Sequence, residues 1–286
     1  MRECINLNGL WKFLPCHGVN PEHAAPEEWG CLRVPGEWRA EAVWPAIENP
    51  GLVDRGSGPD WETFGNGSSV SAGWLTRDVA VPAEWSGKRI LLTQYRHVTE
   101  LEVYGGGCFL GKFDYLRDYL DITQAMKPGS SAPLYLFIPD DFGVTGDLRL
   151  ETRPSGGWIS SVHVLTSVEK KRLSLKAVLR DTNGVRSVSF TAEIFKDGKP
   201  VITFTASAPD TEIEENTAVM SWLWKDPVLW DIGRPNLYTL RLRAEGPEIR
   251  DRYDLRFGFR EIKTAGKNFY LNGRRINFRP VNGTAA

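Results

Sequence analysis

The residue types that most often build metal, redox or nucleophilic sites are scattered along this sequence. The four cysteines show no Cys-x-x-Cys spacing, and the four histidines do not cluster near them, which argues against a zinc or redox centre. No Gly-x-Ser-x-Gly segment is present, so a Ser-His-Asp hydrolase of that type is unsupported. The sequence therefore predicts no metal, no cofactor and cysteines that are buried free thiols.

Aromatic side chains on long loops are the other candidates for chemistry. Residues 48–72 contain five glycines around Trp61 and Phe64 and show no strand pattern, and loops of this length are often functional. Either ring could stack on the apolar face of a pyranose, or could pin the loop to the protein. Trp158 is open to the same two interpretations, as a ligand contact or as core. Three further tryptophans are expected in the core: Trp11, Trp74 and Trp230.

Length and composition limit the possible classes of protein. A chain of 286 residues predicts two domains with a remnant of a third. The net charge of −1 argues against a nucleic-acid partner, and no apolar stretch reaches the ~20 residues of a membrane helix. The N-terminus lacks the apolar core of a secretory signal, but a trimmed chain would look the same, so periplasmic, secreted and cytoplasmic locations stay open.

The elements that must position these residues are β-strands. Apolar and polar residues alternate over 74–81, and short β-rich runs follow at 89–95, 100–104 and 133–138. The best helical candidate is one or two turns at 121–127. The second half has about seven short strands in about ninety residues, the spacing of an immunoglobulin-like sandwich. We expect hairpin turns at 196–199 and at Asn272-Gly273, and a domain boundary near 166–171 that joins closely packed domains.

Motifs along nearly the whole chain resemble those of glycoside hydrolase family 2. The last of them, a Gly-Phe-Arg strand end followed by a Leu-Asn-Gly hairpin, resembles the entry to that family's catalytic barrel. The segments that carry the resemblance, in order, are residues 7–13, 33–38, 73–88, 156–162, 230–238 and 257–283. Residues 279–282 depart from the pattern, since Pro280 stands where the family usually has Gly.

The resemblance implies an all-β fold for most of the chain. It implies a jelly-roll (galactose-binding-like) sugar-binding sandwich over residues 1–167 and an immunoglobulin-like β-sandwich over 168–260. Residues 261–286 would be the hairpin and first-strand stub of a truncated (β/α)8 (TIM) barrel. In some members an acidic residue before the end of the jelly roll contacts the sugar or a bound cation, and Asp147 falls at that place, with a solvated loop carboxylate as the alternative.

The family's chemistry is retaining hydrolysis of β-galactosides, β-glucuronides, β-mannosides or related sugars, which needs two carboxylates about 5 Å apart. The resemblance implies that both are barrel glutamates and that the acid/base follows an Asn. No Asn of this chain is followed by Glu. We therefore expect no catalytic residue here and an inert chain.

Three functions remain open from the sequence. The chain is the non-catalytic N-terminal portion of a β-glycosidase, a stand-alone carbohydrate-binding module, or a scaffold that forms a homo-oligomer. The first predicts that residues beyond about 262 are disordered or borrow contacts, because their partner strands in the barrel are absent.

Overall fold

The computed structural model describes residues 2–15, 30–37, 72–95, 100–113, 119–139, 143–182, 187–207, 212–214 and 216–278. These residues are β-strands and turns, and the chain divides into two compact units, Arg2–Ser155 and Gly156–Ala286. Among the described segments there is no helix long and apolar enough to cross a membrane.

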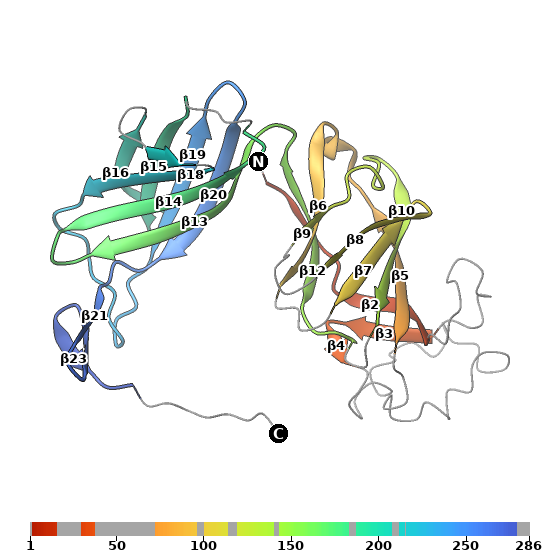
Figure 1. The fold of residues 1–286 in the computed structure, drawn as a ribbon, viewed down its shortest axis with the longest axis horizontal. Coiled ribbons are helices and arrows are strands. Elements are labelled where there is room, and N and C mark those ends of the chain that lie inside the picture. The colour runs from red at the N-terminus through yellow and green to blue at the C-terminus, as the bar shows by residue number, and fades with distance from the viewer. Residues whose placement is uncertain are drawn as a thin grey trace. The chain divides into compact units, whose positions relative to one another are not determined.

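The first unit is a sandwich of two antiparallel sheets (Figure 1). One sheet has the order β1 (Cys4–Asn6), β12 (Asp147–Pro154), β6 (Lys88–Tyr95), β9 (Tyr119–Asp121). The other has the order β3 (Gly30–Val34), β2 (Gly9–Pro15), β5 (Gly73–Ala80), β10 (Ser131–Ile138), β7 (Leu101–Gly105), β8 (Cys108–Phe113). A short ladder joins β4 (Gly36–Glu37) to β11 (Gly143–Val144), and a 3-10 turn covers Ala83–Trp85.

Alternation along the strands fills the space between the two sheets. Trp11, Phe13 and Leu75 point into the core and are at most 1% exposed, as a half-buried strand requires. The indole N–H of Trp11 donates to the Leu7 carbonyl at 2.8 Å, so its polar edge has a partner inside the core. Gly73 is needed beside Phe13, because a Cβ there would lie 2.5 Å from the Phe13 ring.

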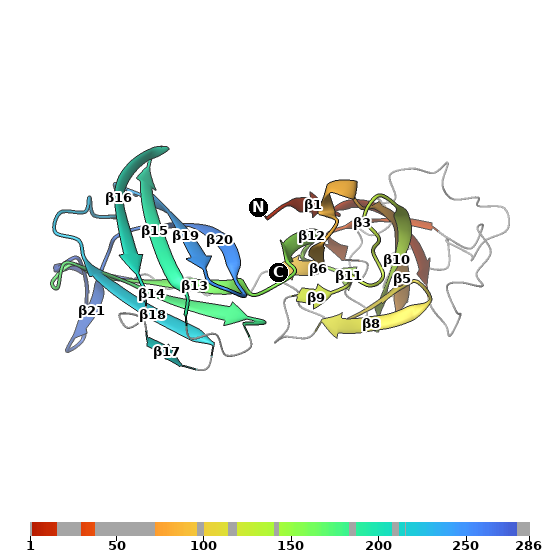
Figure 2. The same ribbon diagram turned by 90° about the horizontal axis from the view of Figure 1, so that it is seen from above.

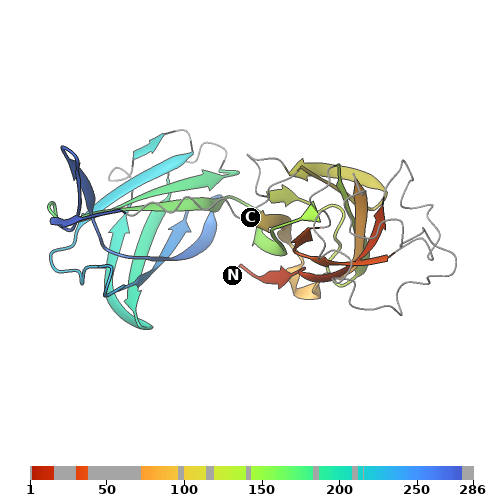
Figure 3. The same cartoon turned by 90° about the horizontal axis from the view of Figure 1, so that it is seen from below.

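The second unit is a second sandwich with a small sheet attached. Its two four-stranded sheets form separate layers (Figure 2, Figure 3). One has the order β13 (Trp158–Ser167), β14 (Arg172–Arg180), β18 (Thr217–Leu223), β17 (Glu212–Glu214). The other has the order β16 (Lys199–Ala206), β15 (Ser189–Lys196), β19 (Tyr238–Glu245), β20 (Arg250–Phe257). The small sheet has the order β21 (Ile262–Ala265), β22 (Asn268–Leu271), β23 (Arg274–Ile276).

The expected hairpin turns are confirmed by their backbone angles. Asp197 and Gly198 have φ of 51° and 76°, and Asn272 and Gly273 have φ of 51° and 81°. Two consecutive positive φ values are the signature of the type I′ turn, which matches the twist of the strands that it joins.

The structure divides the chain earlier than the sequence predicts. The division falls between Ser155 and Gly156 rather than between residues 167 and 168, because β13 pairs along its whole length with β14. Ile159 on β13 is fully buried in the core of the second sandwich. The strand that the sequence assigns to the end of the first domain is therefore the first strand of the second.

Three smaller expectations were wrong. Cys4 and Cys108 are exposed, and only Cys31 of the described thiols is buried. Residues 121–127 form one turn, in which the N–H groups of Ala125 and Met126 both donate to the Ile122 carbonyl, and not a helix. Residues 262–276 form three short strands that pair with one another, against the expectation for this stretch, and residues 279–286 lie outside the described residues.

Candidate functional site

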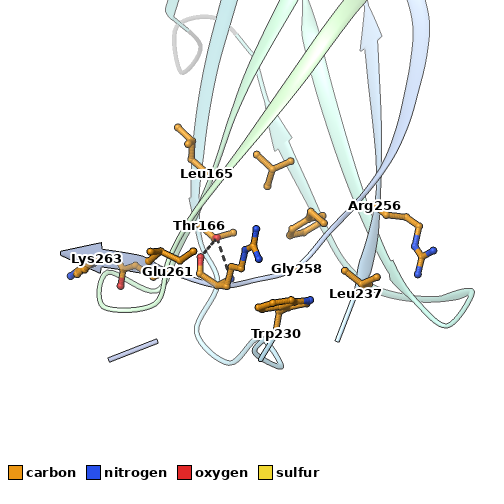
Figure 4. Close-up of a pocket in the computed structure, with 12 residues that line it drawn as sticks. Leu165, Thr166, Trp230, Leu237, Arg256, Gly258, Glu261 and Lys263 are labelled. Carbon is orange, nitrogen blue, oxygen red and sulfur yellow. Dashed lines mark hydrogen bonds and ion pairs between the residues drawn. The ribbon is translucent and has the colours of Figure 1, made fainter. Parts of the chain in front are cut away.

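A groove of about 740 Å³ lies in the second unit, where the second sandwich meets the small sheet (Figure 4). Three segments far apart in the sequence form it: the end of β13, the loop before β19, and the stretch from the end of β20 into β21. Its apolar lining includes Leu165, which is 62% exposed, and Ile262, which is 49% exposed.

The Trp230 ring forms one wall of this groove. Its close packing on Gly258 leaves no room for a side chain, since a Cβ at that glycine would lie 2.7 Å from the Trp230 ring. The Arg260 guanidinium lies 4.5 Å from the centre of the same ring, a cation–π distance. The backbone N–H of Trp230 also donates to the Phe259 carbonyl at 3.0 Å. The wall is therefore fixed by backbone and side chain together.

Glu261 fastens the small sheet to the second sandwich. Its carboxylate accepts hydrogen bonds from the Ser167 hydroxyl at 2.8 Å and from the Glu169 N–H at 3.1 Å. Its own N–H donates to Oδ1 of Asn272, and the Asn272 N–H donates back to the Glu261 carbonyl. Lys263 pairs with Glu169 and lies 3.7 Å from the Glu261 carboxylate.

The pKa of Glu261 reflects these contacts. Burial alone would raise the pKa, but the hydrogen bonds from Ser167 and Glu169 and the charge of Lys263 outweigh it, so the pKa lies below its ordinary value of 4.5. A lowered folded-state pKa means that the carboxylate stabilises the fold above about pH 4.5, and that this contribution is lost as the pH falls through the folded-state value.

We expect Glu261→Gln to lower the free energy of unfolding of the second unit by about 1 kcal/mol near pH 7. The difference from the unmodified chain should shrink as the pH falls from the ordinary pKa through the lowered folded-state pKa, since the carboxylate takes up a proton first in the unfolded and then in the folded state. Thermal unfolding at pH 7 and pH 3.5 measures this. Glu169→Gln is the control, because that side chain is 69% exposed and its ion pair contributes little. An equal loss from Glu261→Gln at both pH values would contradict the assignment.

The described lining of the groove combines apolar side chains with four charged ones, Arg256, Arg260, Glu261 and Lys263. Glu261 is the only carboxylate among its described lining residues, and it already holds two hydrogen bonds and a nearby lysine. Ile262, which lines the groove, lies on the same face of the small sheet as Phe269 and Ile276. On that face Phe269 is 40% exposed and packs on Phe278, which is 58% exposed. We call Leu165, Ile262, Phe269, Ile276 and Phe278 the docking face.

Asp147, the carboxylate singled out from the sequence, lies at the start of β12 in the first unit. It accepts hydrogen bonds from the Asn8 side-chain amide at 2.8 Å and from Arg149 at 2.9 Å. These contacts, the Asn8 bond first, outweigh burial and lower the pKa of Asp147. Because Asn8 Oδ1 also accepts from the Leu148 N–H, the pair ties the β1–β2 turn to β12. A sugar contact by Asp147 stays a prediction.

The burial of the tryptophans differs in part from the prediction. Trp158 is 3% exposed in β13, which favours the core role over the ligand role. Trp11 is buried as predicted, whereas Trp74 and Trp230 are only partly buried, Trp74 on the outer face of its sheet and Trp230 in the groove. Trp61 and Phe64 lie outside the described residues, so their stacking role also stays a prediction.

The groove itself was not predicted from the sequence. Its lining residues Trp230, Leu237 and Arg260 lie, in the sequence, in a motif expected to be core and at a strand end.

Comparisons with known proteins agree with this architecture. The sequence model of Glycosyl hydrolases family 2 matches residues 158–260. A β-galactosidase of Bacteroides ovatus is 26% identical over 98% of this chain and 34% of its own length. A putative β-glucuronidase of Formosa agariphila is 26% identical over 96% of this chain and 33% of its own length.

Solved structures show the same fold. A Bifidobacterium dentium β-glucuronidase, complexed with coumarin-3-O-glucuronide, superposes with a TM-score of 0.73 at 18% identity, over 96% of this chain and 50% of that one. The chain spans about a third of the length of these two curated relatives and about half of this solved structure. The family model on the second sandwich and the relatives aligned along almost every residue support membership of glycoside hydrolase family 2.

Proposed function

We propose that this chain is the non-catalytic N-terminal portion of a retaining β-glycosidase and that its docking face supports a (β/α)8 catalytic barrel. The observation that carries the proposal is the alignment of 98% of the chain with 34% of a β-galactosidase. The described residues form β-strands, turns and the connections between strands. This composition fits a supporting portion of the enzyme and not a (β/α)8 catalytic barrel. The carbohydrate partner would then be a β-glycoside bound in the barrel.

The exposed apolar side chains of the docking face support this role. Leu165, Ile262 and Phe278 are each about half exposed or more, although they lie next to well-buried neighbours such as Leu271. Contiguous apolar surface of this kind marks a place where another protein surface binds. The small sheet presents it at a fixed angle, since Glu261 and Asn272 hold the sheet to the second sandwich.

The first test is activity. The purified 286-residue chain should not hydrolyse chromogenic β-galactosides, β-glucuronides or β-mannosides above the rate in buffer. The reason is that no Asn-Glu pair for the acid/base of the family is present in the sequence. Turnover that follows the purified chain through chromatography would overturn the non-catalytic assignment.

The second test is docking. The chain should co-purify with the polypeptide encoded downstream in its own reading frame when the two are expressed separately. Changing Ile262 and Phe269 to Lys should abolish this, because lysine charges would be desolvated at the contact. Leu223→Lys is the matched control, since Leu223 is 60% exposed but lies outside the docking face. A downstream frame without a barrel, or co-purification that survives the double change, would refute the proposal.

A further inference from the structure

The outer face of the six-stranded sheet in the first unit carries five aromatic side chains in two neighbouring rows. In one row Trp74 on β5 lies beside Phe137 on β10, and Phe137 lies beside Glu102 on β7. In the next row Tyr135 on β10 lies beside Tyr104 on β7, and Tyr104 lies beside Phe109 on β8. We call Trp74, Tyr104, Phe109, Tyr135 and Phe137 the aromatic face; Figure 1 shows its four strands side by side.

Neighbouring rings of the aromatic face are in contact. The ring centres of Trp74 and Phe137 are 4.8 Å apart, those of Trp74 and Tyr104 5.2 Å, and those of Tyr104 and Phe109 5.2 Å. Phe109 is 55% exposed, and the other four are partly buried. The buried face of the same strands has its own core, with Leu75, Val103 and Leu136 at most 1% exposed and Phe113 fully buried, so the core does not require the aromatic rings on the outside.

A polar pair lies within the aromatic face. The Tyr104 hydroxyl donates to the Glu102 carboxylate at 2.6 Å. Burial, and after it the neighbouring Glu102, raises the pKa of Tyr104 to about 12, so the hydroxyl keeps its proton at any ordinary pH. The second Glu102 oxygen is left to accept from another donor, and the Tyr104 oxygen has lone pairs of its own.

We propose that the aromatic face binds a neutral, extended β-linked oligosaccharide. Aromatic rings match the apolar C–H faces of pyranose rings. A few fixed polar groups among the rings can exchange hydrogen bonds with sugar hydroxyls, and this combination is usual in ligand sites. Four adjacent strands span about 14 Å at a strand spacing of about 4.8 Å, which is enough for a short oligosaccharide. The site lies on a different unit from the docking face and goes beyond the proposed function.

The charges on this surface select the class of ligand. Glu102 lies inside the aromatic face, and Lys112 at its edge pairs with Glu100 at 3.5 Å. A nucleic acid would need concentrated positive charge at this place. A uronic acid would bring its carboxylate next to Glu102, which leaves neutral sugars as the class that fits.

Isothermal titration calorimetry of the purified chain tests the proposal, with cellotetraose, β-1,4-mannotetraose and β-1,4-galactotetraose as probes. At least one should bind with a dissociation constant below about 1 mM. Phe109→Ala and Tyr104→Phe should each weaken it about fivefold, the first through lost stacking and the second through the lost hydroxyl. Leu223→Ala, which removes an apolar side chain of similar exposure outside both faces, should leave the affinity unchanged.

Three results would overturn the proposal. One is the absence of binding to all three sugars. Another is unchanged affinity in either Phe109→Ala or Tyr104→Phe, both of which replace partly or largely exposed groups that the fold does not need. The last is self-association on a sizing column that Phe109→Ala abolishes, since a second copy of the chain would then cover the face. None of these results bears on the docking of a barrel.

Discussion

Trp224→Ala is expected to destabilise the second sandwich by about 3–5 kcal/mol, the cost of removing a large buried aromatic ring. Trp224 is 5% exposed and meets the rings of Tyr238 and Phe259 edge-on, at 4.9 Å and 5.4 Å between ring centres. A domain is stable by only about 5–15 kcal/mol, so the second unit would lose a large part of its stability. Calorimetric unfolding measures the loss.

The two separate cores give this experiment an internal reference. Trp224 belongs to the core of the second sandwich and to no cluster of the first, so the unfolding transition of the first should keep its temperature. Leu223→Ala is the control, because that neighbouring side chain is 60% exposed and its removal should cost less than about 0.5 kcal/mol. Equal losses from the two changes would contradict the packing described for Trp224.

Asn272→Ala is expected to release the small sheet from the second sandwich at a cost of about 2–4 kcal/mol. The change removes two hydrogen bonds, from the Asn272 amide to the Trp230 carbonyl at 2.8 Å and from the Glu261 N–H to Oδ1 at 2.9 Å. It also places alanine at a φ of 51°, where a Cβ adds about 1–2 kcal/mol of strain. Amide hydrogen exchange over residues 262–276 should lose its protection.

Two further changes at the same position separate these causes. Asn272→Gly removes both hydrogen bonds but tolerates the positive φ, so it should cost less than Asn272→Ala. Asn272→Asp keeps the acceptor for the Glu261 N–H and loses only the donor to the Trp230 carbonyl. If all three variants retain full protection over residues 262–276, Asn272 does not hold the sheet.

Local patterns predicted the strands because each strand needs only its own alternation and its own turn. Residues 74–81 alternate apolar and polar side chains, and β5 lies there within one residue at each end. Asn272-Gly273 is a turn because those two residues tolerate positive φ better than others. The jelly-roll and immunoglobulin-like sandwiches follow from such elements taken together with the family motifs.

Properties that join distant segments could not be read in the same way. The unit boundary was misplaced because β13 pairs with β14, and no composition change marks Ser155. The groove brings together residues about 90 positions apart, such as Thr166 and Arg260, whose hydroxyl and carbonyl meet at 2.5 Å. The aromatic face needs the register of four strands, so Trp74 was assigned to the core although it lies on the outside.

The joint at Glu261 and Asn272 also has a mechanical consequence. The small sheet is attached through the turn after β13, through the carbonyl of Trp230 and through the backbone at Glu261, three anchor points that are distant in sequence. A force on the small sheet is therefore shared among three anchors instead of passing through one peptide linkage. The small sheet and the second sandwich should therefore rotate as one rigid body. A protein bound to the small sheet would keep its orientation relative to the second sandwich.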